Sequence, residues 1–217
     1  MVATPVFARA RIQKILAALD HAYPKADTAL RYRTPLELLI ATILSAQCTD
    51  ELVNKVTVDL FAKYRTAQDY ARATPAALAK HIARVNFYRT KAKHLHAACR
   101  LLVERFGGRV PNRMDDLVQL PGVARKTANV VLNNAFKVPS GIVVDTHVIR
   151  LSQRLGLTAQ TDRDKIEQDL LGLIPQPHWI RFGHQLILHG RQVCKARGAR
   201  CGECVLGAAL CPSYLRV

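Results

Sequence analysis

Four cysteines close to the C-terminus have the strongest potential for chemistry in this sequence. They follow the spacing Cys-x6-Cys-x2-Cys-x6-Cys, and they are Cys194, Cys201, Cys204 and Cys211. No secretory signal peptide is recognisable, so we expect a reducing cytoplasmic environment, where such a group predicts a metal site rather than disulfides. Structural zinc usually binds two short Cys-x2–4-Cys pairs, and this chain has one. The wide outer spacings therefore favour an iron–sulfur cluster over zinc.

A second candidate is the segment Leu-Pro-Gly-Val-Ala-Arg-Lys-Thr-Ala at residues 120–128, a tight turn followed by a helical pattern. Backbone N–H groups at a helix start suit a phosphate, because the helix dipole favours an anion there. Gly122 would let the backbone approach a DNA strand closely. A lone Pro-Gly pair is equally typical of an ordinary interhelical turn, but the complete string is more specific.

Lys126 and Asp145 are the candidate catalytic residues. Lys126 lies just inside the expected helix, where the dipole opposes a positive charge and so favours a neutral, nucleophilic amine. In a basic protein, however, a lysine is most often a solvated surface residue. Asp145 follows an apolar run and has the pattern of a helix N-cap, worth about 1 kcal/mol. A capping carboxylate can also stabilise positive charge on a substrate, so we expect both roles.

The charge balance restricts the partners. With 32 Lys and Arg against 16 Asp and Glu, the formal net charge is +16 and the isoelectric point about 10.1. Such a surface attracts polyanions and favours nucleic acid, although charge used only for solubility is an alternative. The hydrophobic content of 49% is typical of a globular protein. No apolar run approaches the roughly 18 residues that span a bilayer, so we expect no membrane association.

The elements that must position these residues all read as helices, and the predicted class is all-α. Apolar residues recur at helical spacing in 36–44, 91–106, 161–174 and 179–190. Three expected helices have threonine N-caps, namely Thr34, Thr49 and Thr74, and Glu37 would complete a capping box with the first. The best strand signal is the short run 141–144. We expect Cys48 and Cys99 to be core residues, and His184 and His189 to pack between helices.

In order and spacing, these motifs resemble the endonuclease III family of helix-hairpin-helix DNA glycosylases, from about residue 34 to residue 211. The landmarks are Leu38–Ala41, Ser45–Gln47, Tyr88 with Lys91-Ala92, the hairpin, Val144–His147, Leu186–Arg191 and the cysteines. The resemblance implies a two-lobed fold. Residues 28–138 would form a six-helix barrel with the helix-hairpin-helix motif at about 117–136. Residues 1–27 together with 139–217 would form a cluster domain, with a [4Fe-4S] loop at 194–211.

The resemblance also implies a function. The protein would be a bifunctional DNA glycosylase and AP lyase of base excision repair that removes oxidised pyrimidines from duplex DNA. Lys126 would displace the base, form a Schiff base with the sugar and nick the strand by β-elimination. Asp145, facing Lys126 at the mouth of a cleft, would assist its deprotonation and support the oxocarbenium-like transition state. The partner would be double-stranded DNA with damaged bases or abasic sites, bound by a monomer at the bacterial nucleoid.

Further DNA contacts follow from the same resemblance. Gln47 and Phe87 match positions that fill the gap left by an extruded base, although core packing is the alternative for Phe87. The remaining expected contacts are Gly122, Val123, Ala124, Arg125, Thr127, His147, Arg191, Lys195, Arg197 and Arg200.

The sequence also departs from the family pattern. Ala124 and Asn86 stand where glycines are usual, and Val118 stands where relatives have a glutamate. The interval before Cys211 is one residue longer than in the family. Two alternatives stay open: a glycosylase of the same fold with another base specificity, and a weakly active or non-enzymatic paralogue that only recognises damage. Lys126 argues against an adenine glycosylase, and the cysteines argue against an 8-oxoguanine lyase.

Overall fold

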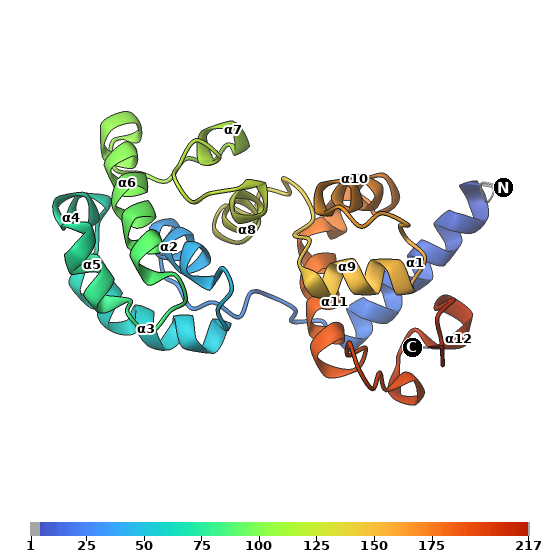
Figure 1. Cartoon of the computed structure of the whole chain (residues 1–217). Coiled ribbons are helices and arrows are strands. Elements are labelled where there is room, and N and C mark those ends of the chain that lie inside the picture. The colour runs from blue at the N-terminus through green and yellow to red at the C-terminus, as the bar shows by residue number, and fades with distance from the viewer. Residues whose placement is uncertain (1–4, 217) are drawn as a thin grey trace. The chain divides into compact units, whose positions relative to one another are not determined.

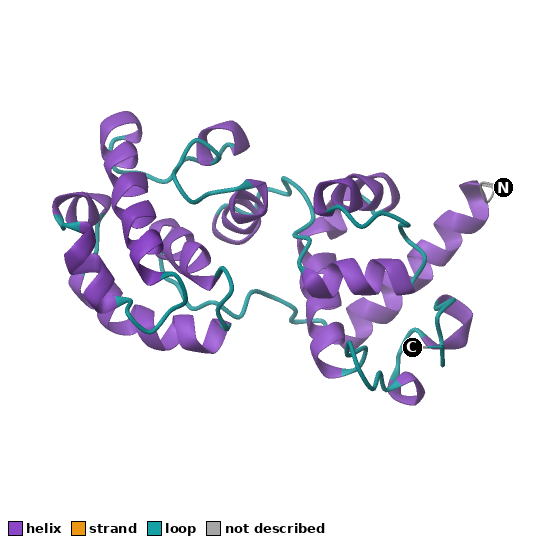
Figure 2. Ribbon diagram, viewed as in Figure 1, coloured by secondary structure: helices purple, strands orange, loops and turns teal. Residues whose placement is uncertain are grey.

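The computed structural model describes residues 5–216, with side chains from residue 9 onward. All regular elements in this range are helices and no strand is present (Figure 2), which confirms the predicted all-α class. The chain forms two compact units, which we describe separately. Residues 28–140 form the hairpin unit, and the described parts of residues 1–27 and 141–217 form the cysteine unit. The identity of one unit as a six-helix barrel and of the other as an iron–sulfur cluster domain remains a prediction.

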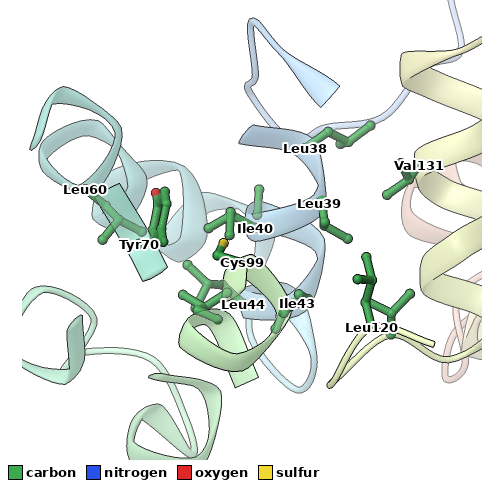
Figure 3. Packing of buried hydrophobic residues seen from close by; sticks show 14 of the residues in the cluster. Leu38, Leu39, Ile40, Ile43, Leu44, Leu60, Tyr70, Cys99, Leu120 and Val131 are labelled. Carbon is green, nitrogen blue, oxygen red and sulfur yellow. The ribbon is translucent and has the colours of Figure 1, made fainter. Parts of the chain in front are cut away.

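The hairpin unit contains the helices α2 to α8. Their bounds are α2 Pro35–Ser45, α3 Asp50–Lys63, α4 Ala67–Arg72, α5 Pro75–His81, α6 Tyr88–Phe106, α7 Met114–Leu117 and α8 Arg125–Ala135. Helix α2 is central, since it contacts α3, α6 and α8 (Figure 1). It is almost uniformly apolar, and every residue from 38 to 44 is buried. A helix that is apolar on all sides is stable only when other helices surround it, and α2 therefore forms the core of this unit (Figure 3).

The helix starts follow local sequence rules. The hydroxyls of Thr34, Thr49 and Thr74 each accept a backbone N–H from the first turn, as predicted. The capping box at Thr34 is formed on one side, because the Glu37 carboxylate accepts the N–H of Arg33, at 2.6 Å. This carboxylate also pairs with the Arg33 guanidinium at 3.2 Å, which accounts for its displacement from the expected partner. Helix α6 begins three residues before the predicted 91 and ends at Gly107, as expected.

The cysteine unit combines the first helix with the last ones. Its helices are α1 Pro5–Ala22, α9 Thr146–Arg154, α10 Arg163–Leu173, α11 Trp179–Gln192 and α12 Gly207–Leu210, with short 3-10 turns at Gln176–His178 and Cys201–Glu203. Helices α1 and α9 both pack against α11 (Figure 1). Ile15 and Leu19 from α1 share one buried cluster with Phe182 and Leu186 from α11. The core of this unit therefore depends on contacts between distant parts of the chain.

The apolar run at 141–144 lies in the cysteine unit. The run 141–144 is buried but has no regular secondary structure, so the strand signal does not produce a strand. All four of its residues are still buried, as expected of an apolar run, and Ile142 is fully inaccessible.

Among the helices described, none has the length and apolar character needed to cross a membrane.

Candidate functional site

The hairpin turn is fixed by both conformation and packing. Gly122 has φ +81°, and a Cβ added to it would lie 2.9 Å from Nδ1 of His94, so glycine is required for both reasons. Leu120 and Val123 on either side are buried and anchor the turn to the core. Because its side chain is buried, Val123 can offer DNA only its backbone. The turn therefore holds the exposed Gly122 backbone in one position at the surface.

Helix α8 begins directly after this turn. Its N-cap residue is Ala124, with φ −88° and ψ 170°, an extended conformation that an alanine adopts without strain. The departure from glycine is therefore accommodated. Alanine provides no side-chain cap to the first turn, which leaves a helix start suited to an anion. Arg125, Lys126 and Thr127 are the first three residues of α8, and all three are half-buried.

Two loops beside α2 carry the candidate insertion residues. Gln47 follows α2 and Phe87 precedes α6, and both have left-handed backbones, with φ of 55° and 56°. Both side chains are exposed, Phe87 by 64%. The structure therefore contradicts the core-packing alternative for Phe87. Asn86 connects the loops, because its side-chain amide donates to the carbonyl of Gln47 at 2.7 Å and its backbone N–H lies 3.2 Å from Sγ of Cys48.

Asn86 stands where the family has a glycine, but it does not itself have a left-handed backbone. The left-handed residue is its neighbour Phe87. Val118, the other departure on this unit, is 42% exposed as the C-cap residue of α7.

Lys91 is a structural residue that sequence reasoning did not identify. It is only 5% exposed, and its ammonium donates to the carbonyls of Leu44 at 2.7 Å and Ala46 at 2.6 Å. These carbonyls belong to the C-terminal end of α2, where a helix has unsatisfied acceptors and a partial negative charge. Lys91 therefore holds the chain that leads into Gln47. A lysine on the apolar stripe of α6, one turn before Leu95, was the signal available in the sequence.

Asp145 is the N-cap of α9, as predicted. Its Oδ1 accepts the backbone N–H groups of His147 at 2.8 Å and Val148 at 2.9 Å. Both bonds use one oxygen, and the carboxylate remains half-exposed. Asp145 and Lys126 belong to different units of the structure. Their expected pairing across a cleft therefore remains a prediction.

His147 and Arg191 lie near this cap in the cysteine unit. His147 is half-buried, and its Nδ1 is 3.2 Å from the Arg150 guanidinium. Burial lowers the pKa of His147, and the positive charges of Arg150 and Arg191 lower it further, against the opposing effect of Asp145. Arg191 is exposed on the last turn of α11. His147 is thus held neutral at physiological pH, able to donate or accept a hydrogen bond.

The cysteine loop follows α11. All four of its cysteines are half-buried free thiols, and Cys194, Cys204 and Cys211 pack against the core of this unit. Burial raises the pKa of the Cys211 thiol, a backbone hydrogen bond from Ser213 acts to lower it, and the nearby Cys204, Cys194 and Cys201 act to raise it. The longer interval before Cys211 contains the short helix α12, which ends directly before that cysteine.

No set of three or more His, Cys, Asp or Glu side chains within the described residues is arranged to hold one metal ion. This finding does not exclude a cluster, because the metal atoms of a cluster lie apart and each cysteine needs to reach only one of them.

The basic residues of the cysteine loop differ in their contacts. Lys195 and Arg197 are exposed. The Arg200 guanidinium donates to the carbonyl of Gln192 and pairs with Glu203 at 2.9 Å, so it stabilises the loop. Arg154 of α9 donates to Sγ of Cys194 at 3.2 Å, a contact that the sequence did not reveal. Arg154 thus brings a positive charge from α9 to a cysteine of the loop.

The hairpin unit also has a groove of about 670 Å³ between α5 and the start of α6. It is lined by residues such as Pro75, Ala79 and Tyr88. None of the predicted site residues lines it, so this groove does not locate the chemistry.

Comparisons with known proteins match this chain over most of its length. Residues 40–176 match the family model described as HhH-GPD superfamily base excision DNA repair protein. The chain is 56% identical to the endonuclease III of Synechocystis sp. over 203 residues, covering 94% of this chain and 92% of that relative. It is 44% identical to the endonuclease III of Bacillus subtilis over 197 residues, covering 90% of each.

A solved non-covalent endonuclease III–DNA complex has a TM-score of 0.89 and 43% identity to this chain. The match covers 96% of this chain and 97% of the solved one. A trapped endonuclease III–DNA covalent intermediate matches equally well.

The fold and the hairpin define an HhH-GPD protein of base excision DNA repair. Within that superfamily, the chain belongs to the endonuclease III family. It is accordingly a bifunctional DNA glycosylase and AP lyase. The resemblance inferred from the sequence motifs is confirmed.

Proposed function

We propose that the chain removes oxidised pyrimidines from duplex DNA and cuts the resulting abasic site, with Lys126 as nucleophile and Asp145 as its carboxylate partner. The observation that carries this proposal is the start of α8. There a glycine turn anchored by buried neighbours leads into a helix without a side-chain cap, and Lys126 lies in its first turn. This arrangement suits the binding of a phosphate next to an amine.

In the proposed reaction, the Lys126 amine attacks C1′ of the damaged nucleotide while the bond from C1′ to the base breaks. The base leaves with the electron pair of that bond and takes up a proton. Loss of a proton from the amine and opening of the sugar give a Schiff base. Removal of a proton from C2′ then expels the 3′ phosphate by β-elimination, which nicks the strand. A lysine in the first turn of a helix suits this chemistry because the dipole disfavours its charged form.

Asp145 supports this reaction with a carboxylate whose orientation is fixed. Its Oδ1 accepts two backbone N–H groups of α9, which hold the side chain in place. We propose that the carboxylate assists deprotonation of Lys126 and stabilises the positive charge that develops on the sugar.

Extrusion of the damaged base costs a few kcal/mol and leaves a gap in the duplex. We propose that Gln47 and Phe87 fill this gap. Their exposure, and the hydrogen bond that joins their loops through Asn86, support a joint role. An exposed phenylalanine in a left-handed conformation is unfavourable for stability, so a function in DNA binding explains it better than packing does.

Further contacts with DNA are proposed on both units. The backbone of Gly122, Val123 and Ala124, with the side chains of Arg125 and Thr127, would bind phosphates at the hairpin. His147, Arg191, Lys195 and Arg197 would do so on the cysteine unit, whereas Arg200 would act mainly by stabilising its loop.

We propose that Cys194, Cys201, Cys204 and Cys211 hold a [4Fe-4S] cluster. The donors fit this group chemically, because all four are free thiols within one short segment of the chain, and Arg154 offers a charged hydrogen bond to one sulfur. When bound, the cluster would hold residues 194–211 in a fixed shape and supply no step of base removal. Monomeric action at the bacterial nucleoid remains a prediction from the family resemblance.

The proposal is tested by borohydride trapping on duplex DNA that contains an abasic site or thymine glycol. Borohydride reduces a Schiff base to a stable cross-link, so the wild-type protein should be trapped. Lys126→Arg should not be trapped, because it keeps the positive charge but lacks a nucleophilic amine. Lys93→Ala is the matched control, since Lys93 is an exposed lysine of the same unit. Trapping of Lys126→Arg at the wild-type level would refute the assignment, and DNA binding without any trapping would favour the damage-recognition alternative.

The role of Asp145 is separable from its cap. In Asp145→Asn the cap is retained while the charge is lost, so the melting temperature should stay unchanged. The rate of base removal should fall by about 100-fold or more in single-turnover assays. Asp145→Ala should in addition lose about 1 kcal/mol of stability. A wild-type rate for Asp145→Asn would leave Asp145 as a cap only.

A further inference from the structure

A chain of three side chains leads from the end of α1 to one of the cysteines. His189 of α11 is buried, with 1% exposure. Its Nδ1 lies 2.8 Å from the hydroxyl of Tyr23, and its Nε2 lies 3.3 Å from Sγ of Cys204. The rings of Tyr23 and His189 meet edge to face, with centroids 5.7 Å apart. Two directed contacts thus connect the end of α1, helix α11 and the cysteine loop.

We infer that Tyr23 and His189 form a relay of hydrogen bonds to the Cys204 sulfur and thereby set the reduction potential and the retention of the metal group held by the four cysteines. The inference rests on the proposed [4Fe-4S] cofactor. His189 and Tyr23 are positioning residues, because they act through Cys204. His189 therefore does more than pack between helices, the role expected from the sequence.

The direction of both hydrogen bonds follows from the chemistry of the sulfur. A metal-bound cysteine has lost its proton, so Cys204 can only accept a hydrogen bond. His189 must then carry its proton on Nε2 and donate it to Sγ. A neutral imidazole has one N–H, and Nδ1 is therefore an acceptor for the hydroxyl of Tyr23. Tyr23 thus selects the tautomer of His189 that can donate to the sulfur.

The surroundings of these groups agree with this assignment. The imidazole of His189 is almost completely buried, and its two ring nitrogens lie within hydrogen-bonding distance of Tyr23 and Cys204. Cys194 receives a different kind of donor, the charged guanidinium of Arg154. Cys204 thus receives a hydrogen bond from the neutral imidazole of His189, and the tautomer of this imidazole depends on the hydroxyl of Tyr23.

A hydrogen bond to a coordinating sulfur favours the more negatively charged, reduced state of an iron–sulfur cluster. Loss of the donor should therefore lower the reduction potential. Loss of such an outer partner also weakens metal binding, typically by about tenfold or more. If the role of His189 were purely structural, its replacement would lower the stability of the protein but would not shift the reduction potential in one defined direction.

The experiment compares Tyr23→Phe, His189→Leu and His189→Gln with the wild-type protein, each purified anaerobically. Iron and sulfide content are determined first. The potential is then measured by voltammetry and by redox titration followed by electron paramagnetic resonance, and the loss of visible absorbance is followed in the presence of a chelator. Tyr64→Phe removes the hydroxyl of a buried tyrosine in the other unit and is the matched control.

We expect His189→Leu to lower the potential and to lose iron about tenfold faster than the wild type. His189→Gln restores an N–H donor and should return the potential toward the wild-type value. Tyr23→Phe keeps the ring contact and should shift the potential in the same direction as His189→Leu, by less, at an unchanged melting temperature. Tyr64→Phe should leave the potential unchanged.

Wild-type potentials in both Tyr23→Phe and His189→Leu would overturn the relay while leaving the cofactor proposal intact. If His189→Leu does not fold, Tyr23→Phe and His189→Gln still decide the matter. A wild-type protein without iron and sulfide would overturn the cofactor proposal itself, and the relay with it.

Discussion

The insertion loops and the cysteine loop are stabilised in contrasting ways. The chain around Gln47 and Phe87 is held by groups of the protein itself, namely the buried ammonium of Lys91 and the side chain of Asn86. The cysteine loop has little core of its own, since Leu206 is the one buried hydrophobic residue between 195 and 216. All four of its cysteines are free thiols, and Cys194, Cys204 and Cys211 instead pack against the unit's core.

This difference predicts which of the two loops would depend on the proposed cofactor. The hairpin unit should keep its loop geometry without metal. The hydrogen bonds that hold its loops, and its core around α2, involve only residues 28–140. The loop at 194–211 should need the metal, because four ordered sulfur ligands replace the apolar contacts that it lacks.

The largest effect should come from Cys201→Ala. Loss of one ligand should release the cluster and destabilise the cysteine unit by more than about 4 kcal/mol. Hydrogen exchange measured by mass spectrometry should show protection lost at 194–211 and retained around Gln47 and Phe87. Cys48→Ala, at another half-buried cysteine, should keep its iron. Equal loss of protection in both regions would contradict the independence of the two loops.

Lys91→Met should have the next largest effect. It leaves the carbonyls of Leu44 and Ala46 without their donor, at a cost of about 2–3 kcal/mol to the hairpin unit. Urea unfolding should show this loss, and the affinity for lesion-containing DNA should fall because the chain leading to Gln47 is released. Lys93→Met, at an exposed position on the same helix, should change stability by less than about 0.5 kcal/mol. The assignment fails if the two variants are equally stable.

The smallest effect on stability is expected at Phe87. Glycine adopts φ of 56° without strain, so Phe87→Gly should leave stability unchanged or raise it by up to about 1 kcal/mol. Both Phe87→Gly and Phe87→Ala should weaken the binding of DNA with an extruded base, measured by fluorescence anisotropy, because the ring is lost. A clear loss of stability in Phe87→Gly would instead show that the ring has a packing role.

Several features were predictable because their causes are local. Thr49 and Thr74 cap helices through contacts with residues three positions away. Asp145 likewise caps its helix through His147 and Val148, which are two and three positions away. The apolar stripes and the spacing of the cysteines required no knowledge of distant contacts either. The apolar run at 141–144 forms no strand, because a strand requires a partner and an apolar run does not specify one.

The sequence by itself determined the helical class, the helix starts, the hairpin turn and the group of four thiols, since each depends on neighbours along the chain. Only the tertiary structure decided the partners of Lys91, Asn86, Tyr23 and His189, which lie in distant segments. The reason is physical. A buried polar group must be satisfied somewhere, but which acceptor it meets depends on how the helices pack.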